Sequence, residues 1–235
     1  MITERQKIIL ETVIREYVTS ASPVSSQFLE ERYDFGICPA TIRSEMQKLA
    51  QEGFLCQPHT SAGRIPTDKG YRFFVNKILE NEKIKTKKTS KVEEVLEQEK
   101  EDTFKLIFHL SRFLAKNSSS LAIVHLFQRE LSWKEGWEEI LKEPEFEEKD
   151  FVSGFSKLLE NFEGDSKRIN SGSKITIYIG EENPFTRADG FSIISSRCLF
   201  PDNEEGTISL LGPKRMAYKE NINLINSVVK LLEEL

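Results

Sequence analysis

The amino-acid sequence predicts an α+β protein in which a helical N-terminal part with a small β-hairpin precedes a second part of mixed structure. Apolar residues in the first 80 positions recur with a helical period, and short turns interrupt that pattern. Between residues 175 and 211 the apolar period changes to two, which is typical of half-buried strands. A last helical stripe follows a Gly-Pro pair at 212–213, so the second part combines a sheet with helices.

The first predicted helix begins at a capping box. Thr3 is followed three residues later by Gln6, and the two side chains of such a pair satisfy free backbone amides at the helix start. The apolar stripe behind it consists of Ile9, Leu10, Val13, Ile14 and Tyr17. We expect this helix to pack behind the two that follow.

Two shorter helices come next, separated by a turn at 34–36. For the first of them we expect Ser22 as the N-cap and Pro23 at the first helical position, where a missing N–H costs nothing. Its apolar side consists of Phe28, Leu29 and Tyr33. The second helix begins at Pro39, and its apolar stripe consists of Ile42, Met46 and Leu49.

The opposite face of the helix that begins at Pro39 exposes no large apolar residue. Its outward positions are Ala40, Ser44, Gln47 and Gln51, with Thr41, Arg43 and Lys48 on the flanks. A small, hydrogen-bonding face of this kind fits the major groove of DNA. Arg43 is the candidate for a guanine contact, Thr41, Ser44 and Gln47 for bases or phosphates, and Ala40 for a thymine methyl. The alternative is a face that is merely solvated.

A basic hairpin follows this helix. Gly53 ends the helix, 54–57 is a predicted strand, 58–63 a loop and 64–66 the returning strand, which together form a wing. Between Gly53 and Leu79 four basic residues stand against one acidic residue, an excess suited to phosphates. The candidate DNA-binding residues of this region are His59, Thr60, Ser61, Gly63, Arg64, Lys69 and Arg72. We expect Thr67 to cap one more helix, with Tyr71, Phe74, Val75, Ile78 and Leu79 in the core.

The stretch from Thr3 to Val75 resembles the winged-helix domain of the bacterial heat-inducible transcription repressor HrcA family. The run QPHTSAGRIPTDKGYR at 57–72 is the most specific part, and ATIR at 40–43 agrees with it. The resemblance implies a repressor of chaperone operons that binds an inverted-repeat operator in double-stranded DNA, is released on heat stress and needs the GroE chaperonin to become active. Where the family has Ser before ATIR and Asn after it, this chain has Cys38-Pro39 and Ser44, so we expect a different operator preference.

The C-terminal part begins with a lysine-rich stretch. Residues 81–91 hold five lysines and are interpreted as a linker, with a basic arm on phosphates as the alternative. A helical pattern runs from Val92 to Ser118, a buried strand is predicted at 121–127, and a second helix follows from Phe151 to Phe162. Three strands at 175–179, 191–200 and 207–211 form a meander before a last helix at 222–232. We expect helices on one side of the sheet.

This part also resembles the family, whose C-terminal core is GAF-like. The matching segments are EEILKEPEF, IYIGEENP and GTISLLGPKRMAY. The family has a longer middle with an inserted segment that contributes to dimerisation, whereas here only a few residues separate LAIVHLF from GWEEILKEPEF. We therefore expect a winged-helix domain at 1–80, a linker at 81–91 and a reduced GAF-like regulatory and dimerisation domain at 92–235. A homodimer, weak or formed fully only on DNA, would use contacts from this core.

Charge and composition narrow the class of protein. The net charge is −5, but residues 1–80 hold ten basic and ten acidic side chains, so the excess of acid lies in the rest of the chain. No apolar run is long enough for a membrane span and the start MITERQKIIL is no signal peptide, which predicts a cytoplasmic protein. The three cysteines lack metal or disulfide spacing, and we expect them to be reduced.

Two other classes of function stay open at this stage. A winged helix can dock a protein partner, but a docking helix should expose large apolar anchors. An enzyme with an appended DNA reader needs a phosphate cradle or a nucleophile beside a base, and the sequence has neither motif. The Glu-Glu-Asn run at 181–183 is interpreted as a turn, and His125 as a hydrogen-bonded structural histidine. We therefore expect no catalytic residues, metal or cofactor.

Overall fold

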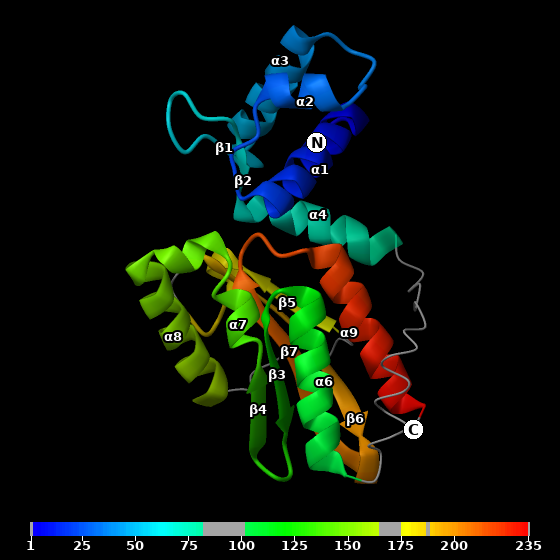
Figure 1. Cartoon of the computed structure of the whole chain (residues 1–235). Helices are drawn as coiled ribbons and strands as arrows, with labels where there is room; N and C mark the ends of the chain where they lie inside the picture. The colour runs from blue at the N-terminus through cyan, green and yellow to red at the C-terminus, as the bar shows by residue number, and fades with distance from the viewer. Residues whose placement is uncertain (1, 82–101, 165–174, 187–188, 235) are drawn as a thin grey trace. The chain divides into compact units, whose positions relative to one another are not determined.

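The computed structural model describes residues 2–81, 102–164, 175–186 and 189–234. The chain divides into two compact units, residues 1–82 and 83–235, and each is described by itself. In Figure 1 the first unit runs from blue to cyan and the second from green to red. The predicted linker beyond residue 81 and the start of the helical pattern at Val92 lie outside the described residues. Within the described ranges, no helix is long and apolar enough to cross a membrane.

The first unit begins with α1 (Glu4–Ser20), and the predicted capping box is confirmed. Thr3 Oγ1 accepts a hydrogen bond from the Gln6 amide at 3.3 Å, and Gln6 Oε1 accepts one from the Thr3 amide at 2.8 Å. The expected stripe is buried at Ile9, Leu10, Val13 and Ile14. This helix contacts both α3 and α4.

The start of α2 (Ser26–Arg32) differs from the sequence prediction. Its N-cap is Ser25, whose hydroxyl accepts a hydrogen bond from the Phe28 amide at 3.0 Å, and not Ser22. The reason is that Val24 is in an isolated antiparallel bridge with Arg64, which keeps this segment extended. Of the expected apolar side, Leu29 is buried, but Tyr33 lies at the C-cap of the helix. Its side chain is exposed, and its hydroxyl donates to Glu16, which raises the pKa of Tyr33.

Helix α3 (Pro39–Gln51) begins at the predicted proline and buries Ile42, Met46 and Leu49, as expected. It also buries Glu45, which falls on the same stripe. The expected turn before it is confirmed, because the Gly36 amide donates to Asp34 Oδ1 at 2.9 Å. Beyond the helix, Gly53 adopts a left-handed backbone conformation with φ of +77°, which residues with a side chain rarely adopt. The helix therefore ends where the glycine predicts.

The hairpin consists of β1 (Leu55–Cys56) and β2 (Ile65–Pro66), paired antiparallel, and leads into α4 (Asp68–Asn81). Thr67 caps α4, since its hydroxyl accepts a hydrogen bond from the Gly70 amide at 3.2 Å. The predicted stripe of α4 is buried except for Leu79, which is 41% exposed. Leu79 lies at the edge of that stripe, one turn beyond the fully buried Val75.

The second unit is built on a five-stranded antiparallel sheet with the order β4-β3-β7-β6-β5. The strands are β3 (Leu121–Leu126), β4 (Leu131–Glu135), β5 (Ile175–Ile179), β6 (Phe191–Phe200) and β7 (Glu204–Pro213). The predicted meander is confirmed as β5-β6-β7, and β3 joins its free edge at β7. Sequence analysis missed β4, an edge strand without a fully buried residue and therefore without an alternating pattern.

The helices of this unit are α6 (Thr103–Ser118), α7 (Trp137–Ile140), α8 (Lys149–Gly164) and α9 (Tyr218–Glu233), with 3₁₀ turns η1 (Pro144–Glu147), η3 (Gly180–Glu182) and η4 (Pro201–Asn203). Helix α6 buries Leu106, Ile107, Leu110 and Leu114, and α9 buries Ile222, Ile225, Val228, Val229 and Leu232. In α8, Phe155, Leu158 and Phe162 are buried, whereas Val152 is exposed.

The expectation that helices cover one side of the sheet is wrong. One face, with Leu121, Ile193 and Leu211, packs against apolar residues of α7, η1 and α8. The residues that alternate with these, such as Ala122, Ile194 and Leu210, are equally buried and point to the opposite face, where α6 and α9 contact the sheet. Both faces are apolar because both are covered.

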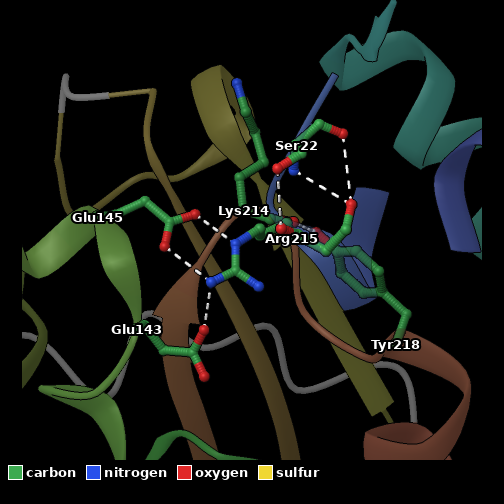
Figure 2. A network of polar contacts seen from close by, with 7 residues as sticks. Ser22, Glu143, Glu145, Lys214, Arg215 and Tyr218 are labelled. Carbon is green, nitrogen blue, oxygen red and sulfur yellow. Dashed lines mark hydrogen bonds and ion pairs between the residues drawn. The ribbon is translucent and has the colours of Figure 1, made fainter. Parts of the chain in front are cut away.

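A buried ion cluster joins the segment after β7 to η1 (Figure 2). The Arg215 side chain is only 9% exposed and donates to Glu145 at 2.6 and 3.0 Å and to Glu143. Burial by itself lowers the pKa of Arg215, but the hydrogen bonds and charges of Glu145 and Glu143 raise it overall. Next to it, the Tyr218 hydroxyl donates to the Lys214 carbonyl at 2.6 Å and lies 2.7 Å from Ser192 Oγ.

We predict that Arg215→Met lowers the free energy of unfolding by about 2 kcal/mol, because two half-buried carboxylates lose their cation. Denaturant unfolding of the whole chain, followed by circular dichroism, measures the change. Lys230→Met is the matched control, since the Lys230–Glu234 pair is more than half exposed and should contribute about 0.5 kcal/mol or less. Equal effects of the two substitutions would contradict a structural role for the cluster.

Candidate nucleic-acid interface

Helix α3 is called the recognition helix from here on. Its outward face is polar. Ala40, Arg43, Ser44, Gln47 and Lys48 are exposed, and the flanking Thr41 is half-buried. Among the described residues, the side chains of Arg43, Ser44 and Gln47 have no hydrogen-bond or ion-pair partner. These side chains can therefore bind another molecule without breaking a contact within the protein.

The first turn of the recognition helix carries an exposed thiol. Cys38 is the N-cap residue, and its Sγ lies 3.2 Å from the Thr41 hydroxyl. This hydrogen bond, with one from the Thr41 amide, lowers the pKa of Cys38. The Thr41 hydroxyl is thus already engaged within the helix, and it has less capacity for a base contact than the free side chains beside it.

The C-terminal end of the recognition helix is held by Lys69. Its ammonium donates to the Glu52 carbonyl at 2.7 Å and lies 4.4 Å from the centre of the Phe54 ring. A cation at a helix C-terminus complements the partial negative charge of the free carbonyls. Sequence analysis missed this role, because the contact joins residues 17 positions apart. Lys48 has a partner on its own helix, since its ammonium lies 3.3 Å from Glu45 Oε1.

The wing loop between β1 and β2 projects away from the helices of the first unit (Figure 1). Gln57, which sequence analysis did not single out, holds it. Its side-chain amide donates to the carbonyls of Thr60 at 2.8 Å and Ala62 at 2.9 Å, and the Ala62 amide donates to the His59 carbonyl at 2.9 Å. The side chains of His59, Thr60 and Ser61 are exposed at the tip.

The base of the wing is tied to the segment before α2. Val24 and Arg64 exchange two backbone hydrogen bonds of 2.9 and 2.7 Å. A Cβ on Gly63 would lie 2.4 Å from the Val24 carbonyl, so the glycine is required by the protein's own backbone. The side chain of Arg64 is half-buried, and its Nε has no partner among the described residues. Arg72 is half-buried and already interacts within the protein.

Glu45 and its partner Gln6 are the other residues of this region that sequence analysis missed. Gln6 Nε2 donates to Glu45 Oε2 at 2.8 Å, and both side chains are buried. A signal was present for Glu45, because position 45 completes the i, i+3, i+4, i+7 spacing that begins at Ile42. A charged residue on an apolar stripe predicts a buried partner from another element.

Outside this region lie the two other features that the sequence analysis named, His125 and the Glu-Glu-Asn run. His125 Nδ1 lies 2.6 Å from Ser132 Oγ, as expected for a structural histidine. The run at 181–183 lies at η3, as the turn interpretation predicted. Beside it is an open cavity of about 580 Å³ lined by Asn161, Glu181, Asn183, Pro184, Phe185 and Thr186. Across the described ranges, no three His, Cys, Asp or Glu side chains are placed to hold a metal.

Comparison with known proteins identifies relatives for both parts of the chain. A family model described as HrcA protein C terminal domain matches residues 72–222. The heat-inducible transcription repressor HrcA of Thermodesulfovibrio yellowstonii (strain ATCC 51303 / DSM 11347 / YP87) is 28% identical over 338 residues, with 99% of this chain and 97% of that protein covered. The repressor of the same name from Natranaerobius thermophilus is 56% identical over 75 residues, 32% of this chain and 22% of that protein.

The alignment with the T. yellowstonii repressor is longer than this chain. Its 338 positions exceed the 235 residues here by 103, so at least that many positions of the relative have no counterpart in this chain. Because nearly the whole of both chains is covered, these positions are internal. Among solved structures, one described as the crystal structure of a hypothetical protein at 2.2 Å resolution has the same fold, with a TM-score of 0.81 at 21% identity over 100% of this chain and 98% of that one.

We predict that Gly63→Ala lowers the free energy of unfolding of the first unit by about 1–3 kcal/mol, because the added methyl group overlaps the Val24 backbone. Thermal unfolding measures the loss. Ser61→Ala, two residues away at the exposed tip, is the control and should change stability by no more than about 0.5 kcal/mol. A Gly63→Ala protein as stable as the control would show that the wing base is not packed against this segment.

Proposed function

The chain belongs to the HrcA family of transcription repressors, which are not enzymes, and we propose that its first unit binds an operator in double-stranded DNA through the recognition helix and the wing. The observation that carries the proposal is the outward face of this helix. Arg43 is exposed there without a partner among the described residues, beside the small or hydrogen-bonding side chains of Ala40, Ser44 and Gln47. A face of this composition can enter a major groove.

The proposed contacts fall into two groups. Arg43, Ser44, Gln47 and Ala40 read base edges, with Arg43 bidentate to a guanine and Thr41 on the flank. The groups that bind phosphate and sugar are Lys48, His59, Thr60, Ser61, Arg64, Lys69, Arg72 and the Gly63 backbone. Arg64 is the best supported of these, since its guanidinium Nε has no partner among the described residues. Lys69 holds the end of the recognition helix and keeps further N–H donors for a phosphate.

We assign the domains, the operator and the regulation of this chain by its resemblance to the HrcA family. Residues 1–80 are the DNA-binding domain, 81–91 a linker and 92–235 a GAF-like domain for regulation and dimerisation. The operator is an inverted repeat upstream of chaperone genes, bound by a homodimer in the cytoplasm. Heat releases the repressor, and a GroE-type chaperonin restores the active form. The name of the relatives, heat-inducible transcription repressor, supports the heat response.

A winged helix that docks a protein is the second candidate class. Such a surface needs buried aromatic or aliphatic anchors. The outward face of the recognition helix has none, because its apolar residues Ile42, Met46 and Leu49 are all buried. DNA is therefore the better supported partner.

Selection from a pool of duplexes with a randomised centre tests the proposal. The whole chain is expected to enrich an inverted repeat, and a gel shift with chaperone-gene upstream DNA is expected to show the same site. If the selection enriches no sequence that the chain binds better than a shuffled duplex, the proposed function is wrong.

We predict that Arg43→Ala weakens binding to the selected duplex by about 1–3 kcal/mol and leaves binding to a shuffled duplex nearly unchanged, because a base contact provides discrimination. Fluorescence anisotropy on both duplexes measures the two affinities. Equal losses on both would show instead that Arg43 holds a phosphate.

We predict that Arg64→Met weakens binding to all sequences alike and makes the slope of log affinity against log salt shallower by about 0.9, which corresponds to one released counterion. Lys77→Met is the matched control, because Lys77 is paired with Glu11 on α1. Its slope should equal that of the unmodified protein. An unchanged slope for Arg64→Met would remove this residue from the phosphate contacts.

We predict two chains on each full inverted repeat, because one reader covers only one half-site. Sedimentation with and without the selected duplex measures the stoichiometry. If association is weak, the apparent affinity also depends on protein concentration. One chain per full repeat at saturation would exclude the dimer.

A further inference from the structure

A buried hydrogen bond joins α1 to the recognition helix. Gln6 is 4% exposed and Glu45 is 8% exposed, and the Gln6 side-chain amide donates to Glu45 at 2.8 Å. A buried carboxylate is costly unless it has hydrogen-bond or charged partners. Glu45 has both, because its second oxygen lies 3.3 Å from the Lys48 ammonium, on the exposed side of the same helix.

The capping box of α1 determines which end of the Gln6 amide faces the recognition helix. Gln6 Oε1 accepts a hydrogen bond from the Thr3 amide at 2.8 Å, so the NH₂ group is the end that points to Glu45. The same side chain thus completes the start of one helix and contacts another. Its orientation is defined by a backbone group and not by packing alone.

The apolar packing of the recognition helix is less directional. Ile42, Met46 and Leu49 are buried, and apolar burial is non-directional, so it does not by itself define the rotation of a helix about its axis. A rotation of about 15° moves side-chain tips, which lie about 5–6 Å from the axis, by roughly 1.5 Å. That displacement exceeds the tolerance of a bidentate hydrogen bond to a base. A hydrogen bond of defined geometry between the helices restricts this rotation.

We propose that the Gln6–Glu45 pair sets the rotation of the recognition helix, so that a residue of α1 with no DNA contact controls how well Arg43 and Gln47 read bases. Gln6 is a positioning residue, supported by the capping box on one side and by Glu45 on the other. The inference rests on the proposed DNA-binding function. It extends that function by making sequence discrimination, more than overall affinity, depend on this pair.

Exchange of the two side chains provides the test. Gln6→Glu preserves the capping box, which accepts either residue at this position, but it places a second carboxylate against Glu45. The double variant Gln6→Glu/Glu45→Gln restores a donor opposite an acceptor and has the same net charge as the unmodified chain. Gln6→Met removes both the donor to Glu45 and the acceptor of the capping box, without adding a charge. Asn76→Asp, at an exposed position of α4, is the control for one added negative charge.

The measured quantity is the ratio of affinities for the duplex that the unmodified chain selects and for its shuffled form. Gln6→Glu and Gln6→Met are expected to lower this ratio about tenfold, as loss of one good base contact would. The exchanged double variant should recover it to within about threefold. Asn76→Asp should leave the ratio unchanged. Far-UV circular dichroism at the binding temperature checks that each variant is folded.

Two results overturn the inference. A folded Gln6→Glu or Gln6→Met protein with an unchanged ratio would show that the pair does not position the helix. A folded double variant with a ratio as low as that of Gln6→Glu would show that the loss does not act through the pair. If Gln6→Glu is unfolded, Gln6→Met and the double variant decide in the same way. A lack of any sequence preference in the unmodified chain is a different result, since it removes the proposed function itself.

Discussion

Two backbone hydrogen bonds between Val24 and Arg64 join the base of the wing to the segment before α2. They keep the segment before α2 extended, so the helix begins at Ser26 and not at Pro23. They also bring the base of the wing so close to this segment that position 63 has no room for a side chain. The base of the wing and the segment before α2 are therefore packed against each other.

The recognition helix illustrates how internal contacts leave a surface available. Lys69 occupies its C-terminal carbonyl end, Gln6 and Lys48 satisfy Glu45, and Thr41 is bonded to Cys38. Polar groups that the fold uses are thus paired, whereas Arg43, Ser44 and Gln47 have no intramolecular partner among the described residues. The polar side chains without an intramolecular partner therefore support the proposed interface more specifically than the net charge does. Residues 1–80 have equal numbers of basic and acidic side chains, so their net charge is zero.

In the second unit, two of the segments that resemble the family contact each other across a long stretch of sequence. Arg215, in the last of these segments, binds Glu143 and Glu145, which are 70 or more positions earlier in the chain. Between β3 and α7 this chain has a turn at 127–130 and the edge strand β4. Strand β3 pairs directly with β4 on one side and with β7 on the other. The alignment with the T. yellowstonii relative is 103 positions longer than this chain.

The sequence by itself determined α1, α3 and α4, the segments that form α6, α8 and α9, the three-stranded meander and the polar face of the recognition helix, because periodicity, caps and turn residues are local signals. The family came from the resemblance of runs such as QPHTSAGRIPTDKGYR at 57–72. Only the tertiary structure decided where α2 begins, that helices cover both faces of the sheet, and that β4 exists. It also revealed that position 63 has no room for a side chain, and that Lys69 and Glu45 have partners within the protein. The physical reason is the same in each case. Each contact depends on a distance in space, which a local pattern of residues does not contain. These contacts are the backbone pairing of Val24 with Arg64, the hydrogen bond of Lys69 to the Glu52 carbonyl, 17 positions earlier, and the buried hydrogen bond between Gln6 and Glu45, 39 positions apart.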